Sequence, residues 1–238
     1  MESIAVILAA GRGTRMKSDL PKPIVPFKGM PLVAHIIKSF EGAGVKNIYL
    51  VVGYGASEVM RVVPVHVGFI MQSEQKGTGH AVMEGKGILP YKNKSLFVFV
   101  GDAPLISSKT IKRLKEHHEQ TGAACTFLTA EFPTGIPYAR IVRDKNGKLI
   151  KCVEEKNATE QEKKINELLS SHFIFNAELL FDNINRIEPD KQNGEYYLTD
   201  MIDIFLKDGK KVEVLKIDSF QELLGLNTPE DLAWAENF

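Results

Sequence analysis

The chain of 238 residues lacks an excess of charge, because 30 Lys and Arg residues balance 30 Asp and Glu residues. A neutral chain has no overall field that would draw it to nucleic acid or to an acidic membrane surface. We therefore expect neither partner, and any bound anion must be held by local groups. In other respects the composition is that of a globular protein, with 44% hydrophobic residues.

Cysteine is scarce, and long apolar runs are absent. Cys125 and Cys152 belong to no CxxC or Cys/His ligand pattern, and each lies in an apolar stretch, so we expect two buried hydrophobic side chains. The first apolar run, at residues 4–10, is too short for a signal-peptide core or a membrane span. These features favour a reducing, cytoplasmic location.

Apolar, β-branched runs alternate with segments of helical periodicity in the first half of the chain. Strands are expected at 4–8, 48–52, 65–71, 96–100 and 124–129. Helices are expected at 31–42, 56–62, 79–88 and 108–120. This alternation predicts a mainly parallel sheet covered by helices on both faces.

The second half is more mixed. The step Asn146-Gly147 predicts a hairpin between strands at 139–144 and 148–153, and the polar segment 158–168 predicts a solvated amphipathic helix. Further strands are expected at 173–175 and 212–217, and helices at 177–187, 198–206 and, with a capping box of Thr228 and Asp231, after Pro229. We expect one domain over 1–238, with a nucleotide-binding half at 1–130 and a sugar-binding half at 131–238.

The loop after the first expected strand is rich in glycine and positive charge. It runs Leu8-Ala9-Ala10-Gly11-Arg12-Gly13-Thr14-Arg15-Met16 and continues to Pro21-Lys22-Pro23. Ligands of open α/β sheets bind beyond the carboxyl ends of the strands, where such a loop can surround phosphate with backbone N–H groups. The third Rossmann glycine and the Walker GK[ST] are missing. We expect loop amides and basic side chains to hold the phosphates; the alternative is a plain turn with solvated charges.

Two further loops carry polar groups at expected strand ends. Gln72 offers both a donor and an acceptor to a base edge, and Gly77 lets backbone approach a planar ring. His80, near a helix start, is expected to be structural rather than catalytic. Asp102 follows a buried strand and is suited to hold Mg²⁺, with Asn227 as a second oxygen ligand; the alternative for Asp102 is a turn or N-cap residue.

Seven strings with these residues occur in order, at 8–22, 72–81, 101–105, 141–144, 153–156, 194–200 and 225–227. Together they resemble the motifs of sugar nucleotidyltransferases, and most of all the uridylyltransferase domains of bacterial N-acetylglucosamine-1-phosphate uridyltransferases. The resemblance extends over nearly all of the chain. It implies a three-layer α/β/α, Rossmann-like fold with a mainly parallel mixed sheet. It also implies a Mg²⁺-dependent enzyme that joins a nucleoside triphosphate, UTP above all, to a sugar 1-phosphate and releases pyrophosphate.

The resemblance implies a role for each matching position. Arg15 and Lys22 would be catalytic and act on the phosphates, and Asp102 and Asn227 would hold Mg²⁺. The nucleotide would contact Leu8, Ala9, Ala10, Gly11, Gly13, Thr14, Gln72, Gly77 and Thr78. The sugar phosphate would contact Gly101, Tyr138, Ala139, Glu154, Lys156 and Leu169. An anionic phosphate nucleophile needs no activating base, so the lack of a Ser/His/Asp or Cys/His constellation agrees with this chemistry.

Two departures from the family bear on the sugar. Ala139 replaces a glycine, and Leu169 replaces the asparagine that contacts the sugar, so an acceptor preference other than an acetamido sugar is expected, unless His172 takes over the contact. The resemblance as a whole still implies a UDP-N-acetylglucosamine-like product. One alternative keeps the chemistry with another acceptor or base: glucose 1-phosphate, dTTP, or CTP with a phosphorylated alcohol. The other is a non-catalytic module that binds sugar nucleotides.

Overall fold

A ten-stranded mixed sheet forms the centre of the computed structural model, which describes residues 2–133 and 135–238. Its strand order is β5-β4-β1-β6-β11-β7-β10-β8-β9, and β12 also pairs with β7. The strands are β1 Ser3–Leu8, β4 Asn47–Val52, β5 Gly68–Met71, β6 Ser95–Val100, β7 Cys125–Glu131, β8 Ala139–Arg143, β9 Leu149–Val153, β10 Glu167–Leu169, β11 His172–Asn176 and β12 Val212–Lys216. A second, two-stranded sheet pairs β2 Pro26–Phe27 with β3 Met30–Pro31.

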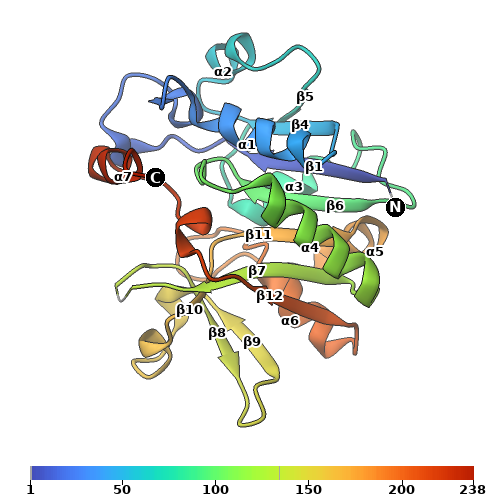
Figure 1. Ribbon diagram of the computed structural model, residues 1–238. Coiled ribbons are helices and arrows are strands. Elements are labelled where there is room, and N and C mark those ends of the chain that lie inside the picture. Colours follow the sequence, from blue (N-terminus) through green and yellow to red (C-terminus); the bar gives the residue numbers. More distant parts are fainter. Residues whose placement is uncertain (1, 134) are drawn as a thin grey trace.

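Helices cover both faces of the large sheet (Figure 1). They are α1 Leu32–Gly42, α2 Ala56–Val62, α3 Thr78–Met83, α4 Ser108–Thr121, α5 Ala177–Asn183, α6 Asp200–Lys207 and α7 Pro229–Ala235. Apolar side chains of α1, α2 and α4 enter one core cluster, and those of α3, α5 and α6 enter another. The expected three-layer α/β/α fold is therefore confirmed.

The parallel part of the sheet explains why its strands have continuous apolar sequences. Along β1, Ile4 and Val6 pack into one core while Ala5 and Ile7 pack into the other, and all four are fully buried. β4 and β6 run parallel to β1 on either side, and β5 runs parallel to β4. As a result the carboxyl ends of these strands share one edge of the sheet.

The second half of the chain adds the antiparallel strands. β11 lies between β6 and β7, and β8 and β9 form the expected hairpin. The hairpin turn closes through Gly147 N–H to Asp144 O at 3.0 Å, with Gly147 at φ 80°. Sheet strands thus come from both halves of the sequence.

The helix expected at 158–168 is wrong. A short 3-10 turn, Glu155–Asn157, ends just before the segment, a second, Glu162–Lys164, lies within it, and β10 begins at Glu167. Thr159 donates from its N–H and hydroxyl to the Glu162 carboxylate, which also pairs with Lys151 at 2.7 Å. Sheet pairing of Leu168 with Ala130 and Arg140 then overrides the helical period.

Other element boundaries move by a few residues. The strand expected at 65–71 begins only at Gly68, and the helix expected at 79–88 ends at Met83. Cys125 is buried as expected, whereas Cys152 is partly exposed. No helix in the described ranges combines the length and the apolar character that crossing a membrane requires.

Candidate active site

The loops that follow β1, β5 and β6 meet at the carboxyl edge of the sheet and enclose a cavity of about 350 Å³. Backbone hydrogen bonds anchor the starts of two of these loops: Ala9 N–H donates to Val51 O of β4, and Gly101 N–H donates to Leu8 O of β1. The predicted residues that line this cavity are Leu8, Ala9, Ala10, Gly11, Gly13, Arg15, Lys22, Gln72, Gly77, Thr78, Gly101, Asp102 and Asn227. Most of the nucleotide positions expected from the sequence are therefore side by side.

Gly13 explains how the glycine loop stays close to the basic segment behind it. It has φ +62°, and a Cβ placed there would lie 2.4 Å from Lys22 Cβ. Thr14, which was expected to contact the nucleotide, begins the 3-10 turn Thr14–Met16 and does not line the cavity. Arg12 also lies outside the lining, with its guanidinium 5.3 Å from the centre of the Tyr54 ring.

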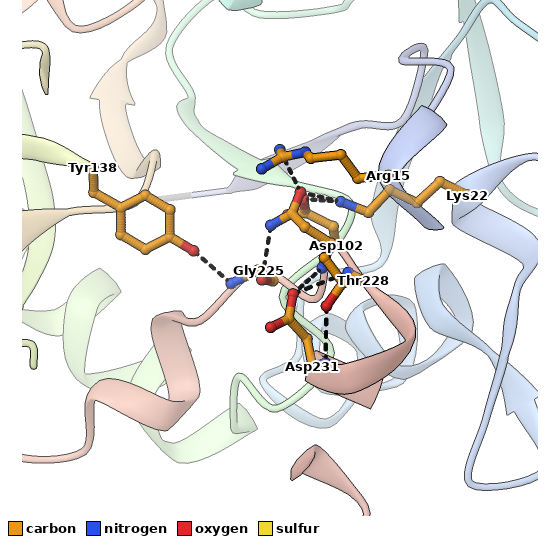
Figure 2. Close-up of polar contacts among 8 residues, drawn as sticks. Arg15, Lys22, Asp102, Tyr138, Gly225, Thr228 and Asp231 are labelled. Carbon is orange, nitrogen blue, oxygen red and sulfur yellow. Dashed lines mark hydrogen bonds and ion pairs between the residues drawn. The ribbon is translucent and has the colours of Figure 1, made fainter. Parts of the chain in front are cut away.

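The two predicted catalytic cations contact the two predicted metal ligands directly (Figure 2). Lys22 Nζ lies 2.5 Å from Asp102 Oδ2 and 2.8 Å from Asn227 Oδ1. Arg15 Nη2 donates to the same Asn227 oxygen at 2.9 Å. The Lys22 and Asp102 side chains are only 12% and 24% exposed, so this charge pair is largely screened from bulk water.

The loop that carries Asn227 is fixed from three sides, and Figure 2 shows the contacts from Tyr138 and Asp231. Leu226 N–H donates to Asp102 O, and Gly225 N–H donates to the Tyr138 hydroxyl at 2.8 Å. Asp231 Oδ2 accepts from Asn227 N–H at 2.8 Å within the expected capping box of α7. Burial raises the pKa of Tyr138, so its hydroxyl stays protonated.

At the other end of the cavity, Gln72 and Gly77 lie together. Gln72 is 3% exposed, and its Nε2 donates to Gly77 O at 3.2 Å. Gly77 has φ +96°, and a Cβ there would lie 2.6 Å from Tyr196 O. Only glycine therefore fits the turn that brings this backbone to the cavity wall.

A second cavity, of about 470 Å³, opens on the side of β8 and β10. Its lining includes the predicted sugar residues Tyr138, Ala139, Glu154 and Leu169. Arg15, Val100, Asp102 and Asn227 line both cavities. The charge cluster, by which we mean Arg15, Lys22, Asp102 and Asn227, thus lies where the two cavities meet.

Two of the predicted sugar residues have different surroundings. Glu154 lines the second cavity and accepts from Thr199 Oγ1 at 2.6 Å, and its burial raises the pKa of its carboxyl. Lys156 does not line either of these cavities. Its ammonium lies 2.7 Å from Asp190 Oδ1 and 4.6 Å from the centre of the Tyr197 ring.

Leu169 is 2% exposed and stands on β10 opposite Ala139. Ser170 and Ser171, which follow it, also line the second cavity, and Ser171 has the positive φ of 59°. His172 is fully buried, does not line this cavity, and lies with Nδ1 3.0 Å from Ser170 Oγ. The alternative in which His172 replaces the missing sugar contact thus has no support in the geometry.

Several lining residues were missed from the sequence. Glu195 and Tyr197 line the first cavity, and Ile136, Gly225 and Asp231 line the second. Glu195 and Tyr197 belong to the string at 194–200, which carried the resemblance but received no role. The position of these two residues in a family motif was the sequence signal that could have identified them as part of the site.

The residues present fit a magnesium ion. An ammonium group already bridges Asp102 Oδ2 and Asn227 Oδ1, so the two oxygens form a position for a cation. Mg²⁺ commonly takes one or two oxygen ligands from protein and the rest from phosphate and water. In the described ranges, no three His, Cys, Asp or Glu side chains group into a metal cage, and such a site does not require one.

The chain is similar in sequence to known proteins, and this similarity identifies its family. A sequence model of the MobA-like NTP transferase domain matches residues 5–174. The bifunctional protein GlmU of Exiguobacterium sibiricum is 41% identical over 236 residues, 99% of this chain and 53% of that protein. Those of Pelotomaculum thermopropionicum and Lactococcus lactis subsp. lactis are 41% and 40% identical, over 100% and 99% of this chain and 52% of each relative. The chain spans about half the length of these relatives, and it belongs to the MobA-like NTP transferase domain family.

Proposed function

We propose that the chain is a Mg²⁺-dependent sugar-1-phosphate nucleotidyltransferase that uses UTP and forms a UDP-sugar, UDP-N-acetylglucosamine-like, with release of pyrophosphate. The observation that carries the proposal is the position of the charge cluster. Arg15, Asp102 and Asn227 line both cavities, where a nucleotide phosphate and a sugar phosphate have to meet. The 41% identity to two proteins named bifunctional protein GlmU supports the same conclusion.

The chemistry needs positioning and charge more than proton transfer. Attack by one sugar-phosphate oxygen on the α-phosphorus forms a new P–O bond and breaks the bond to pyrophosphate. Arg15 and Lys22 would neutralise the two polyanions and the charge that grows on the leaving group. A magnesium ion held by Asp102 and Asn227 would supply Lewis-acid stabilisation of the phosphate oxygens.

The nucleotide would lie in the first cavity, with its base at Gln72 and Gly77 and its phosphates at the glycine loop. Gly11 and Gly13 provide backbone near Lys22, as phosphate binding requires. The sugar phosphate would lie in the second cavity, beside Glu154 and Tyr138.

The identity of the acceptor depends on Leu169. Its apolar side chain lines the second cavity where the resembled family carries an amide. A buried sugar amide that lacks a partner loses about 1 kcal/mol or more. Within this class of product, Leu169 therefore supports a weaker preference for an acetamido sugar than in enzymes with asparagine there.

The test is a pyrophosphate-release assay over four nucleoside triphosphates and several sugar 1-phosphates, each with Mg²⁺ and with EDTA. The proposal predicts turnover only with a triphosphate and a sugar phosphate together, and none in chelator. Release of pyrophosphate without a sugar phosphate, or full activity in EDTA, would contradict it.

A further inference from the structure

A row of polar groups supports the Gln72 amide. Gln72 Nε2 lies 3.0 Å from His80 Nδ1, and His80 Nε2 lies 3.2 Å from Glu84 Oε1. His80 is in α3 and Glu84 is its C-cap residue, four positions later, so the two side chains lie on one face. Gln72 itself lies just after β5 and lines the first cavity.

The chemistry of these partners decides which way the amide faces. Gly77 O, 3.2 Å away, can only accept, so the Gln72 atom beside it must be the NH₂ group. The second amide hydrogen then points to His80 Nδ1, which must accept. A neutral imidazole that accepts at Nδ1 carries its proton on Nε2, and the Glu84 carboxylate accepts that proton's hydrogen bond.

This arrangement leaves the carbonyl oxygen of Gln72 as its free polar atom. No residue in the described ranges 2–133 and 135–238 donates to Oε1. Gly77 is the N-cap residue of α3, and its N–H has no hydrogen-bond partner within that helix. The cavity wall therefore offers an acceptor and a donor from two neighbouring residues.

Such a pair matches one class of base. Uracil and thymine carry a carbonyl next to an N–H on one edge, whereas cytosine carries an amino group next to an unprotonated ring nitrogen. A turned amide would present its NH₂ group, which can donate to the ring nitrogen of cytosine but cannot accept from the ring N–H of uracil. The orientation of the Gln72 amide thus decides whether the side chain can bind the ring N–H of uracil or the unprotonated ring nitrogen of cytosine.

We propose that His80 and Glu84 are positioning residues that fix the Gln72 amide with its oxygen toward the base and so make the enzyme select an imide base over cytosine. The inference deepens the proposed function and rests on it. Neither side chain would touch the reacting phosphates.

The experiment measures kcat/KM for UTP and for CTP, at a fixed sugar 1-phosphate, by pyrophosphate release. The ratio of the two values is the readout, because general damage to the fold or to the phosphate site lowers both in parallel. The variants are His80→Leu, which removes the acceptor, and His80→Asn, whose carbonyl oxygen takes the place of Nδ1. Glu84→Lys places a donor opposite Nε2, while Glu84→Gln still offers an acceptor.

We expect the UTP to CTP ratio to fall about tenfold or more in His80→Leu and Glu84→Lys, as for loss of an oriented polar partner. His80→Asn and Glu84→Gln should retain most of it. The matched control is His66→Leu, since His66 forms a comparable pair with Glu41 at 2.8 Å outside both cavities. That variant should keep the wild-type ratio.

An unchanged ratio in His80→Leu and Glu84→Lys, with a wild type that prefers UTP, would overturn the inference and leave the proposed function intact. Equal loss of the ratio in His80→Leu and His80→Asn would also overturn it, because the acceptor would then be irrelevant. A wild type that releases no pyrophosphate with any triphosphate would instead contradict the proposed function.

Discussion

Lys22 lies between two oxygen atoms that also suit a metal ion. Its ammonium contacts Asp102 and Asn227 and neutralises the Asp102 carboxylate. Two cations close together near one carboxylate would repel each other in a half-buried site. Binding of a metal–nucleotide complex should therefore move Lys22 from these oxygens to the phosphates, where its charge is needed.

The first prediction concerns the cations that line the cavity. Arg15→Ala and Lys22→Ala should each lower kcat about 100-fold or more while nucleotide affinity changes less, because the leaving pyrophosphate gains charge in the transition state. Steady-state kinetics and nucleotide binding by calorimetry measure the two effects. Arg12→Ala is the matched control, since Arg12 belongs to the same loop but does not line the cavity. Wild-type kcat in both test variants would make Arg15 and Lys22 mere loop charges.

A second prediction concerns the acceptor. Leu169→Asn should raise kcat/KM for N-acetylglucosamine 1-phosphate about tenfold relative to glucose 1-phosphate, since an amide partner returns to the cavity wall. Mannose 1-phosphate completes the comparison, and Ile150→Asn at an exposed strand position is the control. If the wild type already strongly prefers the acetamido sugar and the variant gains nothing, Leu169 carries no specificity.

At the scale of elements, the sequence predicted best where local patterns and tertiary packing agree. The capping box at Thr228 formed as expected, and so did the buried parallel strands. The helix predicted at 158–168 was wrong because the charges there follow a helical period, whereas Leu168 pairs with two strands of the sheet. Ser171 marks a separate feature that sequence periodicity does not reveal. Its φ of 59° lies in the turn between β10, which pairs with β8, and β11, which pairs with β6.

The contact between α4 and β7 gives a prediction about pH. His118 is 4% exposed, and its Nδ1 lies 2.9 Å from Thr126 Oγ1. Burial lowers the pKa of this imidazole to about 4. The unfolded chain takes up a proton near pH 6.5, whereas the folded chain resists until about pH 4. Stability is therefore lost as the pH falls through this window, by roughly 2–3 kcal/mol at pH 4.5 for this group.

Urea unfolding of the wild type and His118→Leu between pH 7 and 4.5 measures this effect. Burial lowers the pKa of His172 similarly and raises that of Asp200 to about 6, which acts in the opposite direction, but both groups are common to the two proteins. The variant should show the smaller loss of unfolding free energy on acidification. Parallel pH profiles would show that His118 does not titrate as its burial requires.

At the scale of the whole molecule, the two halves of the chain each contribute to one site. The first half supplies Arg15 and Asp102, and the second supplies Asn227 from a loop far away in sequence. Sequence motifs predicted most of the lining of the first cavity, because strand ends converge by rule in an α/β sheet. They could not predict that Lys156 pairs with Asp190, since that contact depends on how two distant loops pack.

The measurement that tests the central claim most directly is a ³¹P NMR time course with UTP, Mg²⁺ and a sugar 1-phosphate, for the wild type and for Asp102→Asn. The wild type should convert both substrates in equal amounts into a sugar nucleotide, with the diphosphate signals of the new linkage, and pyrophosphate. Asp102→Asn, with its fold checked by circular dichroism, should be slower by orders of magnitude and should bind Mn²⁺ more weakly in the presence of nucleotide. Formation of UMP and pyrophosphate with the sugar phosphate left unchanged, or full activity in the variant, would contradict the account.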